Sequence, residues 1–112
     1  MNNKESLRRT ARTVAYLVYT RESKKLTRAK VAVRCGITQN MLIRYESGSS
    51  IPSLPLLFKW CDALEIEAGS VMAIPRDEIP DVETQARMIL ELYEASVLGS
   101  EDASDKEQMS LF

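Results

Sequence analysis

The segment from Gly36 to Gly48 constrains the fold most, because it contains a short helix together with both of its ends. Gly36 suits the left-handed conformation that ends a preceding helix. Thr38 is a good N-cap residue, and Gly48 follows the last helical residue. Between these ends, Leu42 and Tyr45 lie on one face of the helix. That apolar face requires a core, so the segment is expected to pack on other helices.

The opposite face of this short helix carries side chains that suit the major groove of DNA. Gln39 and Asn40 have carboxamides, which donate and accept hydrogen bonds and therefore match the major-groove edge of adenine. Arg44 lies one turn after Asn40, and its guanidinium matches the O6 and N7 atoms of guanine. Ile43 lies one turn after Gln39 and has two interpretations. It contacts a thymine methyl group, or it packs against the preceding helix or the following loop.

Hydrophobic periodicity and capping residues predict five short helices, one longer helix and a tail. The predicted helices span residues 5–23, 28–35, 39–47, 54–64, a short segment from 70, and 82–98, with Thr27, Thr38, Ser53, Ser70 and Asp81 at their starts. The inward residues of the fourth helix are expected to be Leu54, Leu57, Trp60, Cys61 and Leu64. The predicted divisions of the chain are a domain at 1–74, a linker and helix at 75–98, and a disordered acidic tail at 99–112.

The net charge of −1 conceals two halves of opposite sign. Residues 1–47 contain eleven basic and three acidic residues, a net charge of +8, whereas residues 48–112 contain four basic and thirteen acidic residues, a net charge of −9. A basic half that contains the polar helix favours a nucleic-acid partner. The acidic half is expected to face away from that partner or to contact another protein.

Composition excludes several classes of protein. The 112 residues contain no histidine, no phosphate-binding glycine loop and no metal-ligand spacing, so the sequence predicts neither an enzyme nor a bound cofactor or metal. No apolar run is long enough for a membrane span, and no secretory signal is apparent. Cys35 and Cys61 lie in apolar helical patterns and are expected to be buried free thiols in a reducing cytoplasm.

Several features at fixed spacing resemble the Cro/repressor type of helix-turn-helix, the XRE family. The resemblance covers about residues 14–72 and rests on Arg21, Leu26, Thr27, the spacing from Ala32 to Gly36, Thr38, Tyr45 to Gly48, Pro52 to Leu54, Leu57 and Leu64. It implies an all-α, five-helix, lambda-repressor-like domain that binds double-stranded DNA as a homodimer at paired half-sites. In the family, an arginine at the end of helix one pairs with a glutamate near the end of helix three. The matching residues here are Arg21 and Glu46, which are therefore expected to form a structural ion pair.

The sequence departs from the family directly after the cap of helix two. The family usually has glutamine there and this chain has Arg28, which favours a phosphate contact over a link to the first recognition residue. The residues expected to contact phosphate are Thr27, Arg28, Lys30, Ser47, Ser49 and Ser50. Arg8, Arg9 and Arg12 either extend this contact or form a solvated basic face.

The sixth predicted helix carries an apolar stripe for which two roles remain open. The stripe packs on the core of the same chain or forms a dimer contact, and its residues are Val82, Ala86, Ile89, Leu90, Tyr93 and Val97. The predicted function is a cytoplasmic, sequence-specific transcription regulator that represses by occupying a palindromic operator. The alternative is a DNA-binding antitoxin whose acidic C-terminal region binds a partner protein. A small-molecule sensor has little support, because no segment outside the core suggests a pocket.

Overall fold

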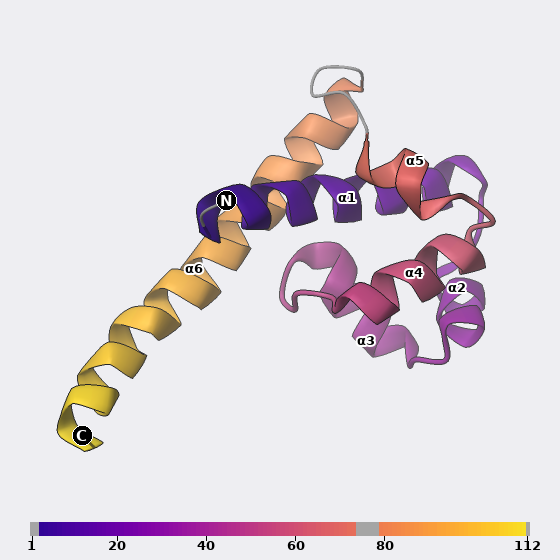
Figure 1. Ribbon diagram of the computed structural model, residues 1–112. Helices are drawn as coiled ribbons and strands as arrows, with labels where there is room; N and C mark the ends of the chain where they lie inside the picture. The colour runs from indigo at the N-terminus through magenta and orange to yellow at the C-terminus, as the bar shows by residue number, and fades with distance from the viewer. Residues whose placement is uncertain (1–2, 74–78, 112) are drawn as a thin grey trace.

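The computed structural model describes the backbone of residues 3–73 and 79–111 and the side chains of residues 3–73 and 79–97. In these residues the regular structure is entirely helical, which confirms the predicted all-α fold (Figure 1). The helices are α1 (Asn3–Ser23), α2 (Arg28–Cys35), α3 (Gln39–Ser47), α4 (Leu54–Ala63), α5 (Ala68–Met72) and α6 (Pro80–Leu111).

Local capping explains where the three short central helices begin and end. The hydroxyl oxygens of Thr27, Thr38 and Ser53 each accept a hydrogen bond from the backbone N–H three residues later, at 3.1, 3.1 and 3.3 Å. These bonds satisfy amides that lack a partner inside the helix. Gly36 and Gly48 have φ angles of 73° and 93°, in the left-handed region that glycine enters without steric cost. The predicted bounds of α2 and α3 are confirmed.

Helix α1 connects α6 to the other helices, because it contacts α3 and α5 and also packs along α6. Figure 1 shows α6 crossing α1 and continuing past the N-terminal end of α1. Helix α2 packs on α3 and α4, and α4 also contacts α5. The most buried large side chains come from five of the helices and the residue after α4, and they include Val14, Leu17, Val31, Leu42, Trp60, Leu64, Ile89 and Tyr93.

The ends of two helices differ from prediction. Helix α5 begins at Ala68 after Glu67, whose side chain makes no capping bond, and not at Ser70. Helix α6 begins at Pro80, and Asp81 lies in its first turn and not at the cap. Proline is favoured at a first helical position, and an acidic first turn complements the helix dipole. Residues 74–78 of the predicted linker lie outside the described residues.

Helix α6 is longer than predicted, since its backbone continues from the expected end near Leu98 to Leu111. Residues 99–111 of the predicted acidic tail fall within this backbone span, and their side chains lie outside the described residues. Gly99 lies inside this span, and one glycine inside a helix costs only about 1 kcal/mol relative to alanine. No proline follows it to end the helix.

The apolar stripe of α6 packs on its own chain. Val82, Ala86, Ile89 and Tyr93 are buried, while Leu90 and Val97 are partly buried against the same core. The first four cannot form the predicted dimer contact while α6 stays on α1, because their surfaces are already covered within the chain. Of the two alternatives for the stripe, the structure shows packing on the core of the same chain.

Two other contacts hold α6 in place. Arg12 on α1 donates from Nε to Glu83 Oε1 at 3.1 Å. Gly48, after α3, lies so close to α6 that an added Cβ would be 3.1 Å from Ile89 Cα and 3.2 Å from Ile89 O. Both of these atoms belong to the backbone, so no rotamer change would relieve the contact. Glycine is therefore required at position 48 by its φ angle and by this close approach.

Helix α4 differs from prediction at its start. Leu54 was expected to point inward but is exposed, whereas Leu56 is buried beside Leu57. The inward stripe of α4 therefore begins two residues later than predicted. At its other end, the last carbonyl groups accept from basic side chains of other segments, since Arg34 Nη1 donates to Ala63 O at 2.9 Å and Lys24 Nζ donates to Leu64 O. Cations at a helix C-terminus are favourable.

Cys35 and Cys61 are buried free cysteines on α2 and α4. Burial raises the pKa of both thiols above its ordinary value. They are therefore protonated at neutral pH and fill the core as small apolar groups.

Candidate DNA interface

Helix α3 presents its predicted base-reading residues to solvent. Gln39, Asn40, Ile43 and Arg44 are all exposed, whereas Leu42 and Glu46 on the other side are buried. This division follows from the helical repeat, because residues three or four positions apart share a face. Helix α3 is thus fixed by its inner side chains while its outer side chains remain available.

Ile43 is 38% exposed, although it is apolar. It lies one turn from Gln39 on the outer face of α3. Exposure favours the interpretation in which Ile43 meets an apolar group of a partner, such as a thymine methyl.

The loop after α3 is tied to the end of that helix. Ser50 N donates to Arg44 O at 3.2 Å, and the hydroxyls of Ser47 and Ser49 are 3.0 Å apart. Ser47 Oγ also donates to Arg44 O at 3.2 Å. A shallow depression of about 190 Å³ beside this loop is lined by Met41, Arg44, Tyr45 and Ser50. The structure therefore brings the three predicted phosphate-binding serines close to Arg44.

The other predicted phosphate contacts lie at the start of α2. Thr27 Oγ1 accepts from Lys30 N, and its hydroxyl hydrogen remains able to donate. The first amides of α2 have no partner inside the helix and form the positive end of its dipole. Thr27, Arg28 and Lys30 are exposed. These groups together can hold an anion.

Glu46 joins α1, α2 and α3. Arg21 at the end of α1 donates from Nε to Glu46 Oε2 at 2.7 Å and from Nη2 to Glu46 Oε1 at 3.2 Å. Its third nitrogen, Nη1, donates to Leu26 O at 3.0 Å. Arg28 at the start of α2 donates from Nε to the same Glu46 Oε1 at 2.7 Å. The buried carboxylate of the recognition helix is therefore held by two arginines on two other helices.

The second of these ion pairs was missed in the sequence. Arg28 was assigned to phosphate alone, because it replaces a glutamine that links to the recognition helix. The position of Arg28, directly after the cap of helix two, could have indicated this pairing. A side chain that reaches α3 as glutamine also reaches it as arginine, and Glu46 is the only acidic residue on α3.

Intrachain partners account for much of the basic half of the chain. Arg8 and Arg9 pair with Glu5 at 2.6 and 3.4 Å, and Arg12 pairs with Glu83. By contrast, Lys30 and Arg44 form no ion pair or side-chain hydrogen bond with any residue that the structure describes. The basic side chains without such a partner therefore include one at the start of α2 and one on the outer face of α3.

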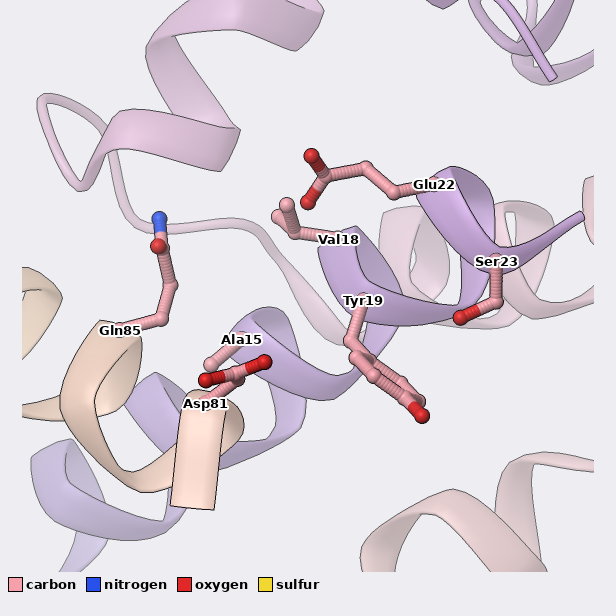
Figure 2. Close-up of a pocket in the computed structure, with 7 residues that line it drawn as sticks. All are labelled: Ala15, Val18, Tyr19, Glu22, Ser23, Asp81 and Gln85. Carbon is pink, nitrogen blue, oxygen red and sulfur yellow. The ribbon is translucent and has the colours of Figure 1, made fainter. Parts of the chain in front are cut away.

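A cavity of about 330 Å³ lies apart from this interface, between the end of α1 and the start of α6. Figure 2 shows Tyr19 and Glu22 from α1 together with Asp81 and Gln85 from α6 around it. The sequence suggested no pocket, because the cavity arises only where α6 crosses α1. Its two carboxylates would repel phosphate, so it does not extend the basic surface.

The α2–turn–α3 unit, with α3 exposed on one face and α2 packed on the other, defines a helix-turn-helix. Residues 17–70 match the family model described as helix-turn-helix, and this part of the chain belongs to the XRE family of that fold. No curated protein and no solved structure matches the chain. The match supports a DNA-binding regulator, and the family is not typically enzymatic. Helix α6 lies outside the matched residues.

Among the helices in the described residues, none is both long and apolar enough to cross a membrane.

Proposed function

We propose that this protein is a sequence-specific transcription regulator that reads double-stranded DNA with the outer face of α3. The observation that carries the proposal is the exposed set of Gln39, Asn40, Ile43 and Arg44 on a helix whose inner face is locked by Leu42 and Glu46. The exposed side chains include donors, acceptors and an apolar group, which are the three kinds of contact that distinguish base pairs in the major groove.

Phosphate contacts at two places would hold α3 in the groove. The start of α2 contributes Thr27, Arg28 and Lys30, and the loop after α3 contributes Ser47, Ser49 and Ser50. One group precedes the recognition helix and the other follows it. Contacts to both flanking backbones would fix the register of α3 without specifying sequence.

Dimeric binding at a palindromic operator is part of the proposal, and α4 supplies a surface for it. Ile51, Leu54 and Phe58 are large, apolar and exposed, and Leu54 and Phe58 are one turn apart on α4. They follow the recognition helix directly in the chain. A second copy bound on this surface would supply the second recognition helix that paired half-sites about 34 Å apart require. Occupation of such an operator within a promoter would repress transcription.

Selection of bound fragments from a random duplex pool tests the proposal. The expected motif is symmetric, with two half-sites about one helical turn apart, and binding weakens steeply as salt is raised. Arg44→Ala should alter the selected motif. Arg87→Ala should not, because this substitution removes the same charge from an exposed position on α6 that lies outside the proposed interface. A pool with no enriched motif, or a motif unchanged by Arg44→Ala, contradicts base reading by α3.

An antitoxin remains the second candidate, and the course of α6 favours it. The backbone of α6 continues to Leu111 and projects beyond the other helices (Figure 1), and residues 99–112 contain four acidic residues and one basic residue. An acidic helical arm suits a basic partner protein. Co-purification with a basic protein encoded next to this one, lost on truncation after residue 98, would favour the antitoxin.

A further inference from the structure

The two arginines that pair with Glu46 use their nitrogen atoms differently. Arg21 donates from Nε and both terminal nitrogens to acceptors in the chain, and its side chain is only 10% exposed. Arg28 donates from Nε alone, and its side chain is 46% exposed. Among the described residues, no acceptor is bound to Nη1 or Nη2 of Arg28. All three guanidinium nitrogens of Arg21 therefore donate within the fold. In Arg28, only Nε donates within the fold, and the two terminal nitrogens remain available to a ligand.

We propose that Glu46 is a positioning residue that holds Arg28 by its Nε and aims the two terminal nitrogens at one DNA phosphate in each half-site. The inference rests on the proposed DNA-binding function. It assigns to Glu46 a role in binding besides its pairing with Arg21, and it makes Arg28 a link between the recognition helix and the DNA backbone.

Charge supports this assignment. Two guanidinium groups and one carboxylate give the cluster a net charge of +1. The solvent-exposed guanidinium of this cluster is that of Arg28. Guanidinium binds phosphate oxygens through two parallel N–H groups, and the terminal nitrogens of Arg28 are free to do so. A bound phosphate would neutralise the cluster and complete an alternating chain of charges from Arg21 to the DNA.

Restraint by Glu46 also reduces the cost of binding. A free arginine side chain loses rotamer freedom when it contacts a ligand. Here the 2.7 Å bond to Glu46 already fixes Arg28 Nε, so part of that ordering is complete before DNA arrives. Because Glu46 lies on α3 and Arg28 on α2, the phosphate contact would also be fixed relative to the recognition helix.

Phosphate-by-phosphate neutralisation of the selected operator tests the inference. Each phosphate is replaced in turn by an uncharged methylphosphonate, and affinity is measured for the full-length protein and its variants. One position per half-site should weaken wild-type binding by about tenfold, the size expected for a charged hydrogen-bonded pair. The same replacement should have little effect on Arg28→Ala, because the contact is already absent.

Arg28→Lys separates positioning from charge. Lysine keeps the positive charge, so the salt dependence of binding should stay near that of wild type. Its three N–H donors share one tetrahedral nitrogen, so lysine lacks the planar guanidinium that can face Glu46 with Nε and present two parallel N–H groups to phosphate. The effect of the critical methylphosphonate should therefore fall to less than half of its wild-type ratio. Equal methylphosphonate profiles for wild type and Arg28→Lys would show that charge alone suffices and would overturn the positioning role.

Glu46→Gln provides the second arm, with thermal unfolding recorded to confirm that the variant is folded at the assay temperature. Arg28 is still present in this variant, but it is no longer held by a carboxylate, so the methylphosphonate effect should shrink as it does in Arg28→Lys. Arg34→Ala is the matched control on α2, because Arg34 donates to a carbonyl of α4 and is expected to leave the profile unchanged.

The outcomes distinguish the inference from the function on which it rests. Failure of wild type to bind any selected duplex would refute DNA binding itself. Specific binding with no phosphate position that depends on Arg28 would refute only the inference. A full wild-type profile in folded Glu46→Gln would show that Arg28 reaches phosphate without help from Glu46.

Discussion

Replacing Ile89 with alanine should destabilise the whole protein, because Ile89 joins α6 to the helix-turn-helix. Its side chain is 1% exposed, and its backbone lies against Gly48. Truncating a buried isoleucine to alanine typically costs about 2–5 kcal/mol, as lost transfer free energy and a residual cavity. For a chain of this size, a loss of about 3 kcal/mol lowers the melting temperature by roughly 10–20 °C.

Circular dichroism during thermal unfolding measures this effect, and Met88→Ala is the matched control. Met88 precedes Ile89 on α6 but is 60% exposed, so its truncation should change stability by no more than about 0.5 kcal/mol. Each protein should be measured over a hundredfold range of concentration. Packing within one chain predicts that the difference between the variants is independent of concentration.

Two results would refute this reasoning. Equal, small effects of Ile89→Ala and Met88→Ala would mean that α6 does not pack on α1 in solution. A loss of stability in Ile89→Ala that appears only near the dissociation range of a dimer would restore the dimer contact for the stripe.

Four further substitutions test other parts of the structure. Glu46→Ala should cost about 3–5 kcal/mol in unfolding free energy, because it leaves buried Arg21 without its carboxylate; a melting temperature equal to wild type would exclude the pair. Tyr93→Phe should preserve or raise stability, since the buried Tyr93 hydroxyl has no hydrogen-bond partner among the described residues. Burial also raises the pKa of Tyr93, so wild-type stability should fall as pH rises above about 10 and this part of the fall should be absent from Tyr93→Phe in alkaline unfolding curves. Arg44→Ala should relax base preference by about 1–3 kcal/mol at one position, whereas Arg28→Ala should lower affinity on all sequences alike and flatten the salt slope by about one unit; selections on both variants would show a reversal of roles.

The central helices could be predicted from sequence because their limits are set locally. A threonine or serine cap needs only the amide three residues later, and Gly36 and Gly48 need only their own φ angles. These interactions lie within a few residues of one another in the chain. Exposure of the outer face of α3 follows from the same local periodicity once Leu42 is placed inside.

Features that depend on distant residues could not be predicted in the same way. The stripe of α6 showed that some surface must cover it, but an apolar pattern does not indicate whether that surface belongs to the same chain. The pairing of Arg28 with Glu46 spans 18 positions and depends on how α2 crosses α3. Leu54 illustrates a smaller error, because it continues the helical pattern of α4 but lies in the first turn, beyond the edge of the core.

Gly48 sets a practical limit on how far the recognition helix can be exchanged. The outer residues Gln39, Asn40, Ile43 and Arg44 are exposed, so their side chains can be exchanged for those of another specificity without repacking the core. A graft that extends past Ser47 replaces Gly48, where an added Cβ would lie 3.1 Å from the backbone of α6 at Ile89. Chimeras that keep Gly48 should therefore fold with α6 in its place on the domain. Chimeras that introduce a side chain at position 48 would have to shift the backbone of α6 to accommodate the Cβ.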